Sequence, residues 1–254
     1  MSRSFEDDDD ELPLIAADMI HVEPIDFERG MNLFPPLTIL FSILCGLFYA
    51  AELSRNALDN EQALIAVGAM NPARVEAGEI WRLLSAAFLH GSAAHLIGNL
   101  IMLYILGMAC EHAFGKMQFL TLFVVSAVCG SIFSFFGGHT SVGASGAIFG
   151  LGGAIVGFFV RNRRHFELRD IRIGWALLCY SGFQLYLGML VPEIDNRAHL
   201  GGLLGGILIG WVLPQALGDF RGKHLSNPIA LGTLFFSILF TAYTAIYFLP
   251  RIIP

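Results

Sequence analysis

Long apolar runs alternate with short polar segments along most of the chain, and this alternation predicts membrane-spanning helices. A helix needs about 20 mostly apolar residues to cross the hydrocarbon core of a bilayer. Seven segments meet or approach that length: 34–52, 93–112, 117–137, 145–160, 173–191, 198–216 and 228–249. The long first connection (residues 53–92) is too polar to cross, and we expect it to pack at the membrane surface. The pattern therefore predicts an all-α polytopic membrane protein.

Composition supports this prediction and excludes several other classes. The chain is 55% hydrophobic and 14% charged, whereas a soluble domain carries about 25% charged residues. Ten of the 21 acidic residues lie before residue 31, so we expect residues 1–32 to form an acidic, disordered, cytoplasmic tail. No basic, aromatic-rich segment suits a nucleic acid, and no nucleotide, haem or metal-ligand pattern is present. We therefore expect no cofactor and no metal.

The distribution of basic residues predicts how the chain is oriented. Cytoplasmic segments of membrane proteins carry an excess of Lys and Arg. With the N-terminus in the cytoplasm, ten of the 15 basic residues fall on the cytoplasmic side, and the cluster from Arg161 to Arg172 accounts for most of the bias. The N-terminus is acidic, with no basic segment before an apolar stretch, so we expect no cleavable signal peptide. The expected location is a bacterial inner membrane.

A few strongly polar residues lie inside the predicted spans, where such residues are costly and commonly functional. His95 and Asn99 lie in the first turns of the second span, Ser145 begins the fourth, and His199 begins the sixth. These three spans run in the same direction because an even number of crossings separates them. The four side chains are therefore expected at a similar depth on the outer face.

These residue types fit nucleophilic catalysis. A serine hydroxyl becomes a good nucleophile when a neighbouring base, such as a neutral histidine, accepts its proton. Asn99 lies four residues after His95, on the same helix face, so both side chains are candidates to stabilise an oxyanion. Small residues also allow membrane helices to approach closely, and glycines recur along the two helices that carry Ser145 and His199: Gly146, Gly150, Gly153 and Gly157, then Gly201, Gly202, Gly205, Gly206 and Gly210.

Each residue alone also has an ordinary structural interpretation. A serine in a membrane helix commonly bonds a nearby carbonyl, and a histidine near a helix start is often an interfacial group. The segment around Ser145 is not the G-x-S-x-G elbow of soluble hydrolases, because Ala147 occupies the last glycine position and no strand precedes it. The joint placement of these residues at one depth favours a serine–histidine pair.

Five short motifs, in order, resemble those of the rhomboid family of intramembrane serine proteases. They are Trp81-Arg82, His95-x-x-x-Asn99, Glu111-x-x-x-Gly115, Gly143-Ala144-Ser145-Gly146, and Ala198-His199-Leu200-Gly201-Gly202 followed by Gly205-Gly206. Their order and spacing agree with the family from about residue 68 to residue 211. Each motif is weak by itself, and the set is specific.

The resemblance implies a fold and a role for each matching residue. It implies a six-helix catalytic core over residues 33–217, and a linker with a seventh transmembrane helix over 218–254. Ser145 resembles the nucleophile and His199 the base, with no third carboxylate, so that Asp195 is expected to be a polar loop residue. His95 and Asn99 resemble the oxyanion-stabilising groups. Supporting or structural roles are implied for the remaining matches: His90, Trp81, Arg82, Glu111, Gly143, Gly146, Gly202 and Phe149, the last stacked on His199.

The expected function is that of an intramembrane serine endopeptidase, a hydrolase that cleaves transmembrane segments of membrane proteins. Its partners would be single-pass transmembrane substrates and the lipid bilayer, with no nucleic acid and no nucleotide. The alternative is a catalytically inactive relative that binds or escorts transmembrane clients. A transporter or channel is disfavoured, because such a protein needs polar residues along a path through the membrane and here they gather at one face.

Overall fold

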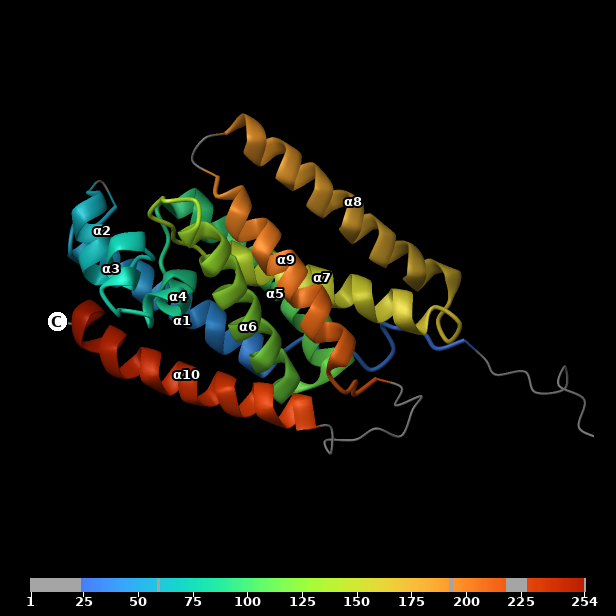
Figure 1. The fold of residues 1–254 in the computed structure, drawn as a ribbon. Coiled ribbons are helices and arrows are strands. Elements are labelled where there is room, and N and C mark those ends of the chain that lie inside the picture. The colour runs from blue at the N-terminus through green and yellow to red at the C-terminus, as the bar shows by residue number, and fades with distance from the viewer. Residues whose placement is uncertain (1–23, 59, 192–193, 218–227, 254) are drawn as a thin grey trace, which may run out of the picture.

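The computed structural model describes residues 24–58, 60–191, 194–217 and 228–253, and the described chain is helical (Figure 1). The first connection holds four short helices: α2 (Glu61–Val67), α3 (Pro72–Glu76), α4 (Arg82–Ser85) and the 3₁₀ turn η1 (Ala86–Phe88). The long helices are α1 (Pro36–Ser54), α5 (Ala93–Phe114), α6 (Lys116–Phe135), α7 (Ser145–Asn162), α8 (Leu168–Leu190), α9 (Asn196–Val212) and α10 (Pro228–Ile252).

Six of these helices, all the long ones except α9, are long and apolar enough to cross a membrane. The prediction of an all-α polytopic membrane protein is therefore confirmed. The segment predicted at 198–216 is shorter than expected, because α9 ends at Val212, two residues before Pro214. Its 17 residues span about 26 Å at 1.5 Å per residue, somewhat less than the hydrocarbon core of a typical bilayer.

The acidic tail is not uniformly disordered, so that part of the prediction is wrong for its last residues. Phe27 is buried and packs against Phe158 and Phe159 at ring-centroid distances of 5.9 and 4.9 Å. Its backbone N–H donates to the carboxylate of Asp170 at 3.0 Å, and Asp26 pairs with Arg169 at 2.8 Å. An aromatic side chain inside an acidic segment gives enough burial to order the chain locally. Residues 1–23 lie outside the described part of the structure.

Helix α7 lies at the centre of the bundle. Within its best 18-residue window 72% of the residues are buried, against 17% for the corresponding windows of α8 and α10. Helices α5, α6, α8 and α9 all pack on it, and Figure 1 shows α8 and α10 at the edges of the bundle. The first residue of α7 therefore starts in the interior of the protein.

Glycine makes the contact between α7 and α9 unusually close. A Cβ atom built on Gly202 would lie 1.9 Å from the carbonyl oxygen of Gly146, and one on Gly206 would lie 1.9 Å from the carbonyl oxygen of Gly150. No side chain fits at such distances, so the two backbones touch directly. Small residues let membrane helices associate in this way, as the glycine spacing predicts.

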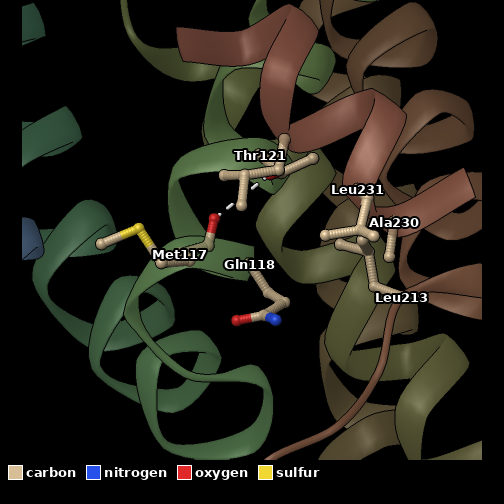
Figure 2. Close-up of a pocket in the computed structure, with 7 residues that line it drawn as sticks. Met117, Gln118, Thr121, Leu213, Ala230 and Leu231 are labelled. Carbon is tan, nitrogen blue, oxygen red and sulfur yellow. Dashed lines mark hydrogen bonds between the residues drawn. The ribbon is translucent and has the colours of Figure 1, made fainter. Parts of the chain in front are cut away.

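A small crevice lies between the start of α6 and the start of α10 (Figure 2). Its lining is mostly apolar and consists of Met117, Gln118, Thr121, Leu213, Ala230, Leu231 and Leu234. The hydroxyl of Thr121 donates to the carbonyl of Met117 at 3.2 Å. Since α6 begins here and ends next to the segment that precedes α7, the crevice lies at the opposite end of the bundle from Ser145.

We predict that Gly202→Ala lowers the free energy of unfolding, by about 1–3 kcal/mol as overpacked cores do, because its methyl group meets the Gly146 carbonyl. Gly46→Ala in α1 is the matched control, since a Cβ there has nothing within 4 Å. Unfolding in mixed detergent micelles measures both variants. Equal stability of the two would contradict the backbone contact.

Candidate functional site

The side chains of Ser145 and His199 form a hydrogen-bonded pair. Ser145 is the first residue of α7 and His199 lies in the first turn of α9. Nε2 of His199 lies 2.9 Å from Oγ of Ser145, and both residues are half-buried. The close approach of α7 and α9 through glycine places the two side chains within reach. A serine and a histidine in this geometry form the arrangement of a nucleophile with its general base.

No carboxylate completes a triad within the described residues. The carboxylate of Asp195 caps the start of α9, where it accepts from the backbone N–H of Ala198 at 3.1 Å, and it also accepts from the hydroxyl of Ser134. Nδ1 of His199 has no hydrogen-bond partner in the described chain. Within the described residues, Ser145 and His199 thus form a pair rather than a triad, and Asp195 is the N-cap of α9.

The imidazole of His199 is held in place by an aromatic ring. Phe149, one turn after Ser145 on α7, stacks on it with ring centroids 4.2 Å apart and an angle of 11° between the planes. The stacking that the sequence predicts is present. Because the ring lies flat against the imidazole, it restricts tilting of His199 while leaving Nε2 directed at Ser145.

His95 and Asn99 lie beside the segment that leads into Ser145. A Cβ on Gly143 would lie 2.6 Å from Cε1 of His95 and 3.4 Å from Nδ2 of Asn99, and Gly143 has a φ of +124°. The position therefore requires glycine for both its space and its backbone conformation. Nδ2 of Asn99 is buried without a hydrogen-bond partner in the described chain. It is a donor beside Gly143, two residues before Ser145.

The ring of His90 packs against the ring of His95. The two rings meet edge to face with centroids 5.3 Å apart, and His90 is fully buried. Burial, assisted by the neighbouring His95, lowers the pKa of His90 to about 3. A ring with this pKa is neutral at pH 7, so it packs against His95 without adding charge.

Glu52 is a buried residue of this region that the sequence interpretation passed over. Both of its carboxylate oxygens accept from the backbone N–H of His90, at 3.1 Å each, and the residue has no exposed surface. It lies at the end of the predicted span 34–52, where a carboxylate in an apolar helix is itself a signal of function or structure. Its role here is to fix the end of the first connection to α1.

Trp81 and Arg82 organise the first connection. The guanidinium of Arg82 is buried and donates to the carbonyls of Ile65 and Ala69 at 2.5 and 2.9 Å, and its Nε donates to Glu79 at 2.6 Å. Burial lowers the pKa of Arg82, and the ion pair with Glu79 opposes this shift. The guanidinium also lies 4.5 Å from the centre of the Trp81 ring. These contacts are structural and do not reach Ser145.

Glu111 is also structural, and lies at the other end of the bundle from Ser145. Its carboxylate accepts from the backbone N–H and the hydroxyl of Thr38, at 2.6 and 2.7 Å. Gly115 has a φ of +86° and its N–H donates to the carbonyl of Glu111 at 3.0 Å, which ends α5. The turn thus joins the end of α5 to the start of α1.

The first connection is bonded directly to the serine loop (residues 136–144). Met70 and Ser141 exchange two backbone hydrogen bonds, of 3.1 and 2.9 Å, in an antiparallel bridge. The N–H of Gly143 donates to the carbonyl of Ala86 at 2.9 Å. These bonds hold the segment immediately before Ser145, so the connection acts as a scaffold for the site.

Comparison with known proteins identifies the family of the chain. Residues 77–216 match the model of the Rhomboid domain. The chain is 35% identical over 215 residues to "Rhomboid protease GluP" of Bacillus subtilis (strain 168), covering 84% of this chain and 41% of the relative. It is 40% identical over 151 residues to "RHOMBOID-like protein 5" of Arabidopsis thaliana, covering 58% and 48%. With "Rhomboid-like protease 5" of Toxoplasma gondii the identity is 34% over 198 residues, covering 73% and 23%.

The chain thus spans less than half the length of these relatives (41%, 48% and 23%). The matched domain contains the Ser145–His199 pair, the glycines between α7 and α9, and part of the first connection. With six helices apolar enough to span a bilayer, the chain is an integral, multi-pass membrane protein that belongs to the rhomboid family.

Proposed function

We propose that this protein is an intramembrane serine endopeptidase whose catalytic residues are Ser145 and His199. The observation that carries the proposal is the 2.9 Å contact between Nε2 of His199 and Oγ of Ser145. The family membership and the relatives whose names describe proteases support it. The catalytic core would occupy residues 33–217, and residues 218–254 would add a linker and the helix α10.

The geometry supports a two-step acyl transfer. Oγ of Ser145 attacks the scissile carbonyl while Nε2 of His199 accepts the hydroxyl proton, and the imidazolium then gives that proton to the leaving amine. Water hydrolyses the acyl-enzyme with His199 again as the base. His95, Asn99 and the backbone N–H of Ser145 at the start of α7 would donate to the oxyanion.

The substrates we propose are transmembrane segments of other membrane proteins, single-pass proteins among them, which reach the site from the bilayer. The alternative is an inactive relative that binds such segments without cleaving them. A hydrogen-bonded serine and histidine favour the enzyme, because a protein that only binds its client has no need to keep the pair aligned.

We predict that a fluorophosphonate probe labels the wild-type protein in detergent and fails to label Ser145→Ala. His199→Ala should lose almost as much labelling rate as Ser145→Ala, since the two residues act as a unit. Ser42→Ala is the matched control, because this serine of α1 bonds the carbonyl of Thr38 rather than a histidine. Equal labelling of all these proteins would exclude the pair as the catalytic centre.

We predict a smaller loss for the oxyanion donor. Asn99→Ala should reduce kcat for a transmembrane substrate by roughly tenfold to a thousandfold, with KM nearly unchanged, as expected for a group that bonds chiefly the transition state. Asn162→Ala is the control: this buried amide bonds Phe158 and Gln215 at the far end of α7. If both variants lower kcat equally, Asn99 acts only through stability.

We propose further that Ser145 lies at the non-cytoplasmic end of the bundle, in a bacterial inner membrane. Five of the basic residues lie from Arg161 to Arg172, around the connection between α7 and α8 at the end opposite Ser145, and such clusters favour the cytoplasmic side.

The orientation can be tested by labelling in whole cells, in a background without Cys45, Cys110, Cys129 and Cys179. A membrane-impermeant thiol reagent should label the Glu76→Cys variant and should not label the Arg164→Cys variant. Both positions are exposed. The reverse pattern would invert the topology.

A further inference from the structure

One face of the last turns of α10 packs on the first connection. Phe248 and Ile252 are 3% and 0% exposed, and they share a hydrophobic cluster with Trp81, Val67, Leu89 and other residues of the connection and of α1. In Figure 1 the C-terminal end of α10 lies at the same end of the bundle as α2, α3 and α4. The rest of α10 is mostly exposed and packs along α6, so these turns are what joins α10 to the connection.

Trp81 is the centre of this contact. Its ring lies 6.4 Å from that of Phe248 at an angle of 28°, a stacked arrangement. The guanidinium of Arg251 lies 4.9 Å from the centre of the Trp81 ring, a cation–π distance. Since Arg82 lies 4.5 Å from the same ring, two cations from different elements contact one indole.

Phe248 also fixes the backbone at Gly68. Its ring carbons lie 2.9 Å from where a Cβ on Gly68 would stand. The carbonyl of Gly68 accepts from the hydroxyl of Ser85 at 2.7 Å. The phenylalanine therefore packs against one side of a backbone segment whose carbonyl is bonded to α4.

From this segment a short series of bonds reaches the candidate site. Ser85 precedes Ala86, whose carbonyl accepts from the N–H of Gly143 at 2.9 Å. Met70, two residues after Gly68, forms the antiparallel bridge with Ser141. Gly143 in turn lies against His95 and precedes Ser145 by two residues. An unbroken series of contacts therefore connects Phe248, through Gly68 and Ala86, to the serine loop.

We propose that Phe248 and Arg251 of α10 are positioning residues for Ser145, acting through Trp81, Gly68 and the serine loop. The inference rests on the proposed protease function for its kinetic test. The contact of Phe248 and Arg251 with Trp81 and Gly68, called the clamp below, thus holds the first connection, which in turn holds the serine loop. A loosened clamp lets the serine loop shift relative to His199 and Asn99, which lowers turnover more than substrate binding.

The kinetic experiment compares two phenylalanines of one helix. Phe248→Ala should lower kcat for a transmembrane substrate and the rate of fluorophosphonate labelling at least tenfold, with KM within about twofold, a split typical of lost transition-state alignment. Phe235→Ala, at a position that is 65% exposed, should leave both rates unchanged. Phe248→Leu, which keeps most of the packing volume, should restore most of the rate.

A second variant serves if Phe248→Ala does not fold. Arg251→Met keeps the apolar stem and removes the cation over Trp81. We expect this variant to fold as the wild type does and to have a severalfold lower kcat. Wild-type kcat in both Arg251→Met and Phe248→Ala would overturn the proposal, and wild-type kcat in Arg251→Met alone would do so if Phe248→Ala does not fold. An equal loss in Phe235→Ala would overturn it as well.

Hydrogen exchange separates this proposal from that of the protease. In Phe248→Ala, or in Arg251→Met in its place, the amides of residues 82–90 and 141–146 should exchange faster than in wild type and Phe235→Ala. If the wild-type protein neither cleaves nor labels while this exchange difference is present, the protease proposal fails and the clamp remains as a structural device. If wild type is active and the exchange is unchanged, the clamp is wrong and the protease proposal stands.

Discussion

The direct backbone contact between α7 and α9 is the constraint on which the rest of the structure depends. Gly202 touches the carbonyl of Gly146, and Gly206 touches that of Gly150. Hydrophobic burial does not drive helices together inside a bilayer, because lipid is as apolar as the side chains. Close packing of small residues supplies the attraction instead. The same contact sets the distance between Ser145 and His199, so the feature that stabilises the bundle also creates the pair.

A helix contact alone does not orient a serine that begins a helix. Ser145 follows a loop, and loops are the mobile parts of most proteins. Here the loop is bonded at Ser141 and Gly143 to the first connection, and that connection is fixed by Glu52 and by the buried guanidinium of Arg82. Polar groups buried near a membrane need partners, and these provide them. Arg82 therefore contributes to the site without contacting it.

Much of this arrangement could be predicted from the sequence. The apolar runs indicated the spanning helices, and the shared direction of three of them placed His95, Asn99, Ser145 and His199 together. These inferences use helical period and topology alone, which is why the sequence is enough for them. The stacking of Phe149 on His199 was implied instead by the resemblance to the rhomboid family.

Other features depend on tertiary contacts that no local pattern encodes. The tail was expected to be disordered because it is acidic, yet Phe27 enters a cluster of aromatic rings contributed by residues about 130 positions later in the chain. Glu52 could have been singled out as a carboxylate at the end of an apolar span, but its partner could not, because that partner is a backbone N–H 38 residues away. The end of α10 was likewise predicted only as a span, since the Trp81 ring that it covers lies in a different part of the sequence.

Two unpartnered polar atoms lie beside this scaffold. Nδ2 of Asn99 and Nδ1 of His199 are buried and have no hydrogen-bond partner in the described chain, and Asn99 lies against Gly143. The bonds of Gly143 and Ser141 to the first connection hold the backbone next to Asn99, and the ring of Phe149 stacks on the imidazole of His199. In the protease that we propose, the rigidity of this surrounding chain would keep the Asn99 amide beside the loop that leads into Ser145.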